Sequence, residues 1–281
     1  MSEADTEPGA PLPPEGTPER TWLDTALSLC DTADRISMQH FRHDLRIQTK
    51  PDRTYVTQAD REIEEAVRAR IRATFPDHGI VGEEFGEELI DATFRWYIDP
   101  IDATNNYLRG VPVFATLIAL EREGEALVGA VSAPALGTRW YAWAGGGAWA
   151  ADQGSRMAPR RLRVSGVSRV EDAQLLTSSP SDPATNVRLP GLAATLRRAW
   201  RERGFGDFWG YALVAEGAAE AMIELGVHSW DLGPMLLLLE EAGGRLTDFE
   251  GRRTIHGRSA IASNGVLHAQ LMSDLGVQHE S

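Results

Sequence analysis

Amphipathic helices and short apolar strands are interleaved along almost the whole chain, and this mixture favours a layered α/β fold. One predicted helix begins near Pro18, and a second follows Thr57, a residue type that caps helix N-termini. The apolar stripes consist of Trp22, Ala26, Leu29, Ala33 and Ile36 in the first helix and of Ile63, Val67 and Ile71 in the second.

Further elements divide into two groups along the chain. The first group contains the strand "RWYI", which ends at Asp99, and the strands "FATLIALE" and "ALVGAVSAP", joined at "REGE". The second begins near Gln174 with the strand "LLTSS" and continues with helices over "LAATLRRAWRER" and "FWGYALVAEG", the strand "AMIEL" and a helix over "PMLLLLEEAGG". We therefore expect a disordered tail over residues 1–18, an N-terminal unit over 19–172 and a C-terminal unit over 173–281.

Composition narrows the classes of partner. The chain has 41 acidic and 28 basic residues and a net charge of −13, so it gains nothing from a phosphate backbone, and nucleic acid is not an expected partner. A single cysteine, Cys30, excludes an internal disulfide and a cysteine-based metal site. The apolar runs are too short to cross a bilayer, and the acidic, Pro-rich N-terminus is not a secretory signal. We expect a cytoplasmic protein with no membrane partner.

Two carboxylates, Asp99 and Asp102, stand close together at the end of a predicted strand in "YIDPIDATNNYLRG". Burying such a pair without compensation is costly, because each ion loses its hydration. Two interpretations follow from these residues alone. Either the pair is solvated in a surface turn, for which Asp and Pro are ordinary residues, or a cation lies between the two carboxylates.

Glu83 in "VGEEFG" and Asp231 in "HSWDLG" extend the acidic set. For Asp231 the structural alternative is a helix cap or a partner of the helix dipole. Carboxylates at strand ends and a helix start can also meet at one edge of a sheet, where they suit a hard cation such as Mg²⁺. The predicted helix N-terminus after Asp102 would hold an anion, and the Thr104 hydroxyl would contact a water, so the set indicates a phosphate-ester site.

Three segments, "GEEFG", "DPIDATNNYLRG" and "WDLGPMLLLLEEAGG", resemble in order and spacing the signatures of the inositol monophosphatase-like family of Mg²⁺-dependent phosphatases. The similarity runs from about Thr21 to the C-terminus. It implies an αβαβα sandwich and an enzyme whose partner is a small phosphate ester. A non-catalytic binding protein on the same scaffold is the alternative, but it predicts the loss of a metal ligand, and none is lost here.

The resemblance also implies the metal ligands. Glu83, Asp99 and the carbonyl of Ile101 would hold one Mg²⁺ ion, and Asp99, Asp102 and Asp231 would hold a second. A third, weaker ion would use Glu83 and waters. This arrangement implies two-metal catalysis, in which the ions stabilise both the attacking and the leaving oxygen.

By the same resemblance, Glu83 and Thr104 would orient the attacking water, and Ala103 and Thr104 would bind the phosphate. Two departures from the family pattern stand near these residues. Ala103 replaces the usual glycine, and Pro234 stands among residues that are usually small. Neither departure removes a ligand.

Three further residues are expected to assist the site. Lys50, the only lysine in the chain, aligns with a lysine on the family's mobile active-site loop and is expected to act in catalysis. Asp60 and Glu84 are expected to lie behind the metal ligands and support them.

Several stretches, among them "GVPVFATLIAL" and "GDFWGYALVAEGAAE", look closest to the bacterial histidinol-phosphatase branch, which implies L-histidinol phosphate as substrate. Inositol monophosphate, or a nucleoside or sugar monophosphate for a recruited paralogue, are the alternatives. Asp207, Glu224 and His228 would contact the substrate, and the two carboxylates would pair with its amine. The structural alternatives for Asp207 and Glu224 are a helix cap and a solvated strand-end acid. Whether the chain forms a homodimer is left open.

Overall fold

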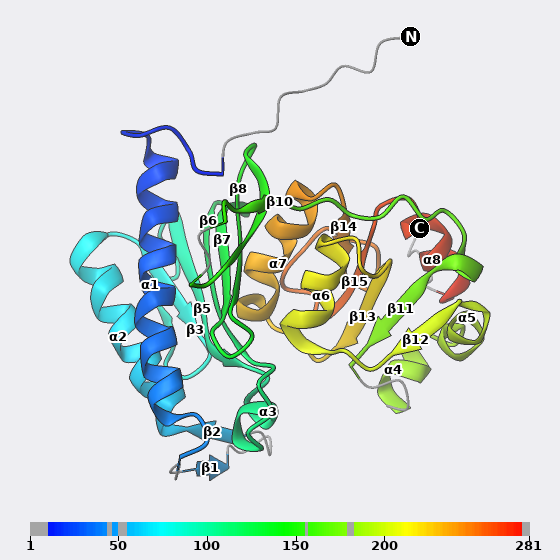
Figure 1. The fold of residues 1–281 in the computed structure, drawn as a ribbon, viewed down its shortest axis with the longest axis horizontal. Coiled ribbons are helices and arrows are strands. Elements are labelled where there is room, and N and C mark those ends of the chain that lie inside the picture. Colours follow the sequence, from blue (N-terminus) through cyan, green and yellow to red (C-terminus); the bar gives the residue numbers. More distant parts are fainter. Residues whose placement is uncertain (1–10, 44–46, 50–54, 155–156, 179–182, 277–281) are drawn as a thin grey trace.

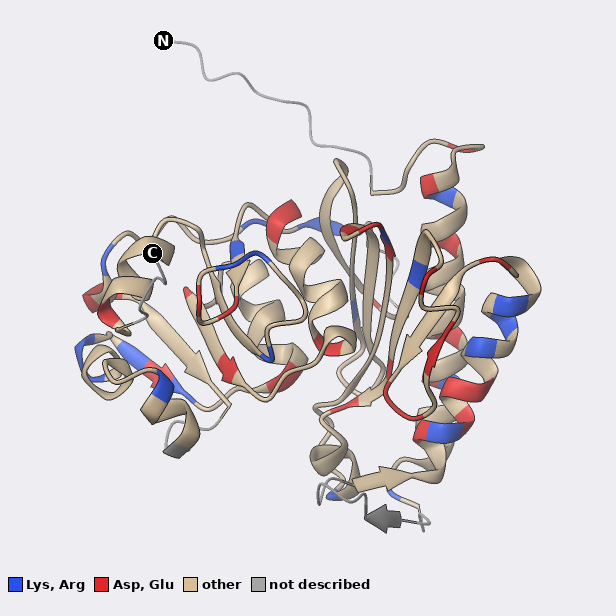
Figure 2. Ribbon diagram, turned by 180° about the vertical axis from the view of Figure 1, so that it is seen from behind, with Lys and Arg blue, Asp and Glu red and all other residues tan. Residues whose placement is uncertain are grey.

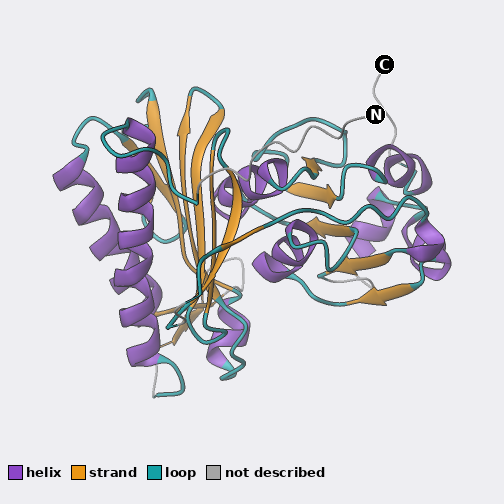
Figure 3. Cartoon of the chain, turned by 45° about the horizontal axis from the view of Figure 1, so that its top comes forward, coloured by secondary structure: helices purple, strands orange, loops and turns teal. Residues whose placement is uncertain are grey.

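The computed structural model describes residues 11–43, 47–49, 55–154, 157–178 and 183–276, in which helices and sheets alternate as layers. From one side to the other these are a helical layer, an eight-stranded sheet, a second helical layer, a five-stranded sheet and a third helical layer (Figure 1). Figure 3 shows the same alternation from above. The predicted αβαβα sandwich is therefore confirmed.

The first helical layer consists of α1 (Pro18–His40) and α2 (Gln58–Thr74), both as the apolar spacing predicted. Thr57 caps α2 as expected, because its hydroxyl accepts from the N–H of Asp60 while the Asp60 carboxylate accepts from the N–H of Thr57. The apolar stripes of both helices are buried against the large sheet. Acidic and basic residues recur along α2 (Figure 2), and most of them are exposed or half-buried, whereas Asp60, Glu64 and Arg68 are buried.

The eight-stranded sheet has the order β10-β9-β8-β7-β6-β5-β3-β4. Only β3 and β5 form a parallel pair, and all other neighbours are antiparallel. The strands are β3 (Gly79–Gly82), β4 (Gly86–Glu88), β5 (Phe94–Asp102), β6 (Ala115–Arg122), β7 (Glu125–Ala133), β8 (Thr138–Trp143), β9 (Gly147–Asp152) and β10 (Arg160–Arg161).

The middle layer consists of α6 (Asp207–Ala215) and α7 (Ser229–Glu241). These helices share one apolar core with the inner faces of both sheets, which contribute residues such as Leu117 from β6 and Met222 from β13. The structure therefore joins the predicted N-terminal and C-terminal units through a common core. The division of the chain at residue 173 stays a prediction.

The five-stranded sheet has the order β12-β11-β13-β15-β14, and the third helical layer covers its outer face. Its strands are β11 (Gln174–Thr177), β12 (Arg201–Arg203), β13 (Ala221–Leu225), β14 (Arg245–Thr247) and β15 (Ser259–Ser263). The outer helices are α4 (Pro183–Arg188), α5 (Leu192–Arg198) and α8 (His268–Asp274). Smaller elements are β1 (Ile47–Thr49), β2 (Tyr55–Thr57), α3 (Thr104–Leu108) and the 3₁₀ turn Val170–Asp172.

Two predicted boundaries are wrong. The helix expected over "LAATLRRAWRER" ends at Arg198, and Arg201–Arg203 instead forms β12, because its backbone pairs with β11 in parallel. The strand expected to end at Asp99 continues to Asp102. Among the described residues, no helix combines the length and apolarity needed to cross a membrane.

Candidate active site

A β-bulge in β5 places Asp99 and Asp102 on the same side of the sheet. Residues three apart on a regular strand point to opposite faces. Here Asp99 pairs with Leu117 and Asp102 with Ala115, so β5 holds one residue more than β6 over this stretch. The hydroxyl of Thr116 donates to the Pro100 carbonyl at 2.7 Å and anchors the bulge. The extra residue brings both carboxylates toward α7.

Asp99, Asp102 and Asp231 form a carboxylate cluster in which one oxygen from each residue lies within 4.8 Å of the others. Asp99 is only 2% exposed, so the solvated-turn interpretation is wrong for it. Its Oδ1 is buried and has no hydrogen-bond partner among the described residues. A buried carboxylate oxygen without a donor, beside two further acids, fits a cation ligand.

Electrostatics support the same interpretation. Burial raises the pKa of Asp99 well above its usual value, and the carboxylates of Glu83 and Asp102 raise it further. Burial also raises the pKa of Asp102, together with the nearby Asp207. A divalent cation reverses this effect, because it favours the charged form of each ligand. The cluster is therefore a site that a cation such as Mg²⁺ would stabilise.

Asp231 is the third residue of α7, and its Oδ2 accepts from the N–H of His228 at 2.7 Å. The helix-cap alternative is thus correct for one of its oxygens. The same carboxylate also belongs to the cluster, so one residue fixes the start of α7 and faces the cation site. Pro234 lies inside α7, where its missing N–H removes one helical hydrogen bond without ending the helix.

Glu83 reaches the cluster because β3 runs parallel to β5 and ends beside it. Its N–H donates to the Ile98 carbonyl at 3.2 Å, directly before Asp99. Glu64 of α2 holds the following turn, since its carboxylate accepts from the N–H groups of Glu84 at 2.8 Å and Phe85 at 3.1 Å. Arg68 pairs with this buried Glu64 at 2.8 Å. The role of Glu64 in holding this turn was not expected from the sequence, although the spacing of Glu64 to Arg68 is that of a helical ion pair.

Ala103 adopts the left-handed conformation (φ 65°, ψ 45°) immediately before α3. This conformation explains why glycine is usual at this position, because a side chain costs roughly 1–2 kcal/mol there. The Thr104 hydroxyl donates to the Ile101 carbonyl at 3.0 Å, which leaves its oxygen lone pairs free to accept from a water.

Most predicted site residues line one cavity of about 270 Å³. These are Glu83, Asp99, Ile101, Asp102, Ala103, Thr104, Asp207, His228 and Asp231. Tyr55, Asn105, Asn106, Gly226 and Trp230 also line it and were not anticipated. The rings of His228 and Trp230 stack at 4.6 Å, which gives the cavity an aromatic wall.

An adjoining cavity of about 210 Å³ contains Glu224 and shares Asp102, Asp207, Gly226 and Asp231 with the first. Glu224 is buried and accepts from the Tyr211 hydroxyl at 2.8 Å, so the solvated-acid alternative is wrong. Burial and the nearby Asp207 raise the pKa of Glu224 to about 7. Asp207 is the first residue of α6 and its cap position is Gly206, so the helix-cap alternative is also wrong.

Asp60 and Glu84 do not line the cavity of about 270 Å³ that contains the carboxylate cluster. Asp60 is fully buried, and burial raises its pKa to about 7, with Glu84 and Glu83 adding to the effect. Asp60 also lies near Asp99, because the Asp60 carboxylate is one of the charges that raise the pKa of Asp99. Lys50 lies outside the described residues.

Comparison with known proteins defines the class of this fold and site. The family model of the inositol monophosphatase family matches residues 19–279, and the chain belongs to this family. It is 46% identical over 254 residues to a histidinol-phosphatase of Mycobacterium tuberculosis, an alignment that covers 89% of this chain and 96% of the other. An inositol-1-monophosphatase of Mesorhizobium japonicum is 33% identical over 235 residues, covering 81% and 85%.

Solved structures agree with this assignment. The Thermotoga maritima IMPase superposes with a TM-score of 0.79 at 30% identity, covering 91% of this chain and 96% of that one. An IMPase/NADP phosphatase complexed with Mg²⁺ and phosphate shares the fold, with a TM-score of 0.80 at 19% identity, 93% of this chain and 97% of that one. The predicted family and fold are confirmed, and the chain is a phosphoric monoester hydrolase on this scaffold.

Proposed function

We propose that this protein is a Mg²⁺-dependent hydrolase of a small amine-bearing phosphate ester, with L-histidinol phosphate as its substrate. The observation that carries the proposal is the acidic cavity beside the carboxylate cluster. Asp207 and Glu224 line it together, and neither carboxylate has a lysine or arginine partner among the described residues. A substrate amine next to them would supply the missing positive charge.

The relatives support this choice of substrate. Three curated histidinol-phosphatases are 36–46% identical to this chain over about nine-tenths of its length. The curated inositol-1-monophosphatases align at 32–36% identity. A neutral polyol such as inositol has no group that needs two buried carboxylates, so the acidic cavity favours the amine.

Cation binding would fall to the carboxylate cluster. Glu83, Asp99 and the Ile101 carbonyl would hold one ion, Asp99, Asp102 and Asp231 a second, and Glu83 a weaker third. When bound there, Mg²⁺ supplies Lewis-acid polarisation of the phosphoryl group and stabilises charge on the leaving oxygen. The unpartnered Oδ1 of Asp99 supports this assignment.

Residues of the chain itself would orient the water, bind the phosphate and contact the leaving alcohol. Glu83 and the acceptor lone pairs of Thr104 would orient a water for in-line attack on phosphorus. Backbone N–H groups at Ala103 and Thr104 would bind the phosphoryl oxygens, and His228 would contact the leaving alcohol. Asp60 and Glu84 would support the ligands, and Lys50 would assist catalysis from its loop. A cytoplasmic location remains a prediction of the sequence, and whether the chain forms a homodimer stays open.

A panel of phosphate esters tests the proposal. We expect the highest kcat/KM for L-histidinol phosphate, a lower value for inositol 1-phosphate and nucleoside monophosphates, and no turnover once Mg²⁺ is removed by a chelator. A preference for inositol 1-phosphate or a nucleoside monophosphate would reject the substrate while leaving the hydrolase class intact.

A further inference from the structure

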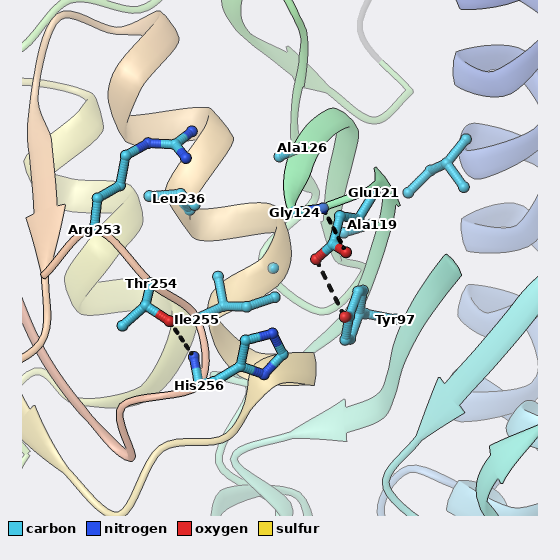
Figure 4. Close-up of a pocket in the computed structure, with 12 residues that line it drawn as sticks. Tyr97, Ala119, Glu121, Gly124, Ala126, Leu236, Arg253, Thr254, Ile255 and His256 are labelled. Carbon is cyan, nitrogen blue, oxygen red and sulfur yellow. Dashed lines mark hydrogen bonds between the residues drawn. The ribbon is translucent and has the colours of Figure 1, made fainter. Parts of the chain in front are cut away.

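A separate cavity of about 190 Å³ lies between β5 and β6 of the large sheet, α7, and the connection between β14 and β15 (Figure 4). Among the described residues, none that lines it also lines either cavity at the carboxylate cluster. Small residues contribute to its lining, including Ala119, Ala126 and Gly233, and they leave room for a ligand. A cavity of about 150 Å³ holds a benzene ring in another protein, so this one is large enough for a single ring with a polar substituent.

One wall of the cavity is polar and carries a buried acid. Glu121 is 5% exposed, and its Oε1 accepts from Arg95 at 2.6 Å and from the N–H of Gly124 at 3.1 Å. Among the described residues, its Oε2 accepts one hydrogen bond, from the Tyr97 hydroxyl at 3.2 Å (Figure 4). A carboxylate oxygen accepts more than one donor, so Oε2 retains capacity for an N–H group in the cavity.

Much of the rest of the lining is aromatic and apolar. The rings of Tyr97 and His256 lie 6.4 Å apart at 56°, and Leu236 and Ile255 line the space beside them. The face of an aromatic ring attracts cations, because its quadrupole is negative there. A flat ligand bearing positive charge therefore matches both the ring faces and Glu121.

The charges around the cavity also favour a cation. Arg253, at the rim, is held by Glu240 at 2.6 Å and by Glu125 at 3.4 Å, and Arg95 is held by Glu121. Three carboxylates thus face two guanidinium groups, and the surroundings keep a negative surplus.

We propose that this cavity is a second binding site, which takes a small flat organic cation whose N–H groups donate to Glu121. The site is independent of the proposed hydrolysis, because it shares no lining residue with the catalytic cavities.

Three compounds of one shape and different charge test the proposal: benzamidine, benzamide and benzoate. Each is titrated calorimetrically into the full-length protein in saturating Mg²⁺ and inorganic phosphate, which together occupy the catalytic site. We expect benzamidine to bind most tightly and benzoate most weakly. Equal binding of benzamidine and benzoate, or no saturable binding at about 10 mM, would overturn the proposal.

Variants then locate the bound cation. Glu121→Gln removes the acceptor charge and Ala126→Met fills the floor, so each should weaken benzamidine binding at least about tenfold. Glu123→Gln, an exposed residue on the adjoining turn, is the matched charge control and should bind as the wild type does. Because Arg95 loses its partner in Glu121→Gln, circular dichroism checks its fold, and Ala126→Met tests the site without that change. Binding that survives both cavity variants but is lost in Glu224→Gln would place the cation in the catalytic cavity and reject the second site.

Discussion

The carboxylates of Asp99 and Asp102 face the same candidate cation site from one bulged strand. Replacing either residue should therefore have a similar effect. Asp99→Asn or Asp102→Asn removes a charge but preserves shape, including the acceptor that Asp102 offers to the N–H of Phe208 at 2.7 Å. We expect kcat to fall by several orders of magnitude at saturating Mg²⁺ with an unchanged circular dichroism spectrum. Asp91→Asn, at an exposed position, is the control. Near-wild-type turnover of either cluster variant would contradict the assigned ligands.

Ala103 offers a second test on a single residue, because its left-handed backbone limits which side chains the proposed phosphate-binding turn accepts. Ala103→Gly should keep or raise kcat/KM for every ester. Ala103→Val should lower it at least about tenfold, since a β-branched residue strongly disfavours positive φ. Steady-state kinetics on p-nitrophenyl phosphate measure both variants. Full activity of the valine variant would show that this turn does not constrain the chemistry.

At the scale of elements, α2 positions the turn that carries Glu83. The buried Glu64 carboxylate accepts from two N–H groups of that turn, so Glu64→Gln should loosen it. We expect a higher Mg²⁺ concentration for half-maximal activity and roughly a tenfold loss of kcat/KM, in keeping with a lost charge-assisted hydrogen bond. Glu65→Gln, an exposed neighbour on the same helix, should leave both values unchanged. Equal effects of the two variants would show that the loss of activity comes from the lost negative charge on α2 and not from the turn that Glu64 holds.

Local patterns were sufficient to predict α1 and α2 and to single out Asp99, Asp102 and Asp231, which meet in the carboxylate cluster, because helix spacing, caps and acidic motifs are encoded in neighbouring residues. The bulge at Pro100 was not predictable, since it exists only in the pairing of β5 with β6. β12 was missed for the same reason: pairing with β11 overrides the helix propensity of "RER". The role of Glu64 depends on where α2 meets the turn after β3, which no local pattern reveals.

Across the whole molecule, the acidic site should make stability depend on pH and on metal. The pKa values of Asp60 and Glu224 are raised to about 7 in the folded protein, and burial also raises the pKa values of Asp99 and Asp102 well above their usual value. A carboxyl group with a raised folded-state pKa binds its proton more tightly when folded. The stability it contributes is therefore present at low pH and is lost as the pH rises through that pKa.

We accordingly expect the Tm of the metal-free protein to fall by at least about 5 °C between about pH 5 and pH 7.5. Mg²⁺ should restore more stability at the higher pH, because it binds the ionised carboxylates. Differential scanning calorimetry with and without chelator measures both effects. A metal-free Tm that rises over this interval would contradict the burial of these acids.

The two adjoining cavities at the carboxylate cluster lie at the junction of three layers of the sandwich. Asp102 comes from the large sheet, Asp207 from α6 and Glu224 from the small sheet. We propose selectivity of this junction for an amine-bearing ester. Its most direct measurement is kcat/KM for L-histidinol phosphate and for p-nitrophenyl phosphate, in the wild type, Asp207→Asn, Glu224→Gln and the exposed control Glu202→Gln. We predict that the first two variants lose at least about tenfold on histidinol phosphate while sparing p-nitrophenyl phosphate, and that the control changes neither. Equal losses on both substrates would show that Asp207 and Glu224 serve the structure alone, and the amine-selecting site would be refuted.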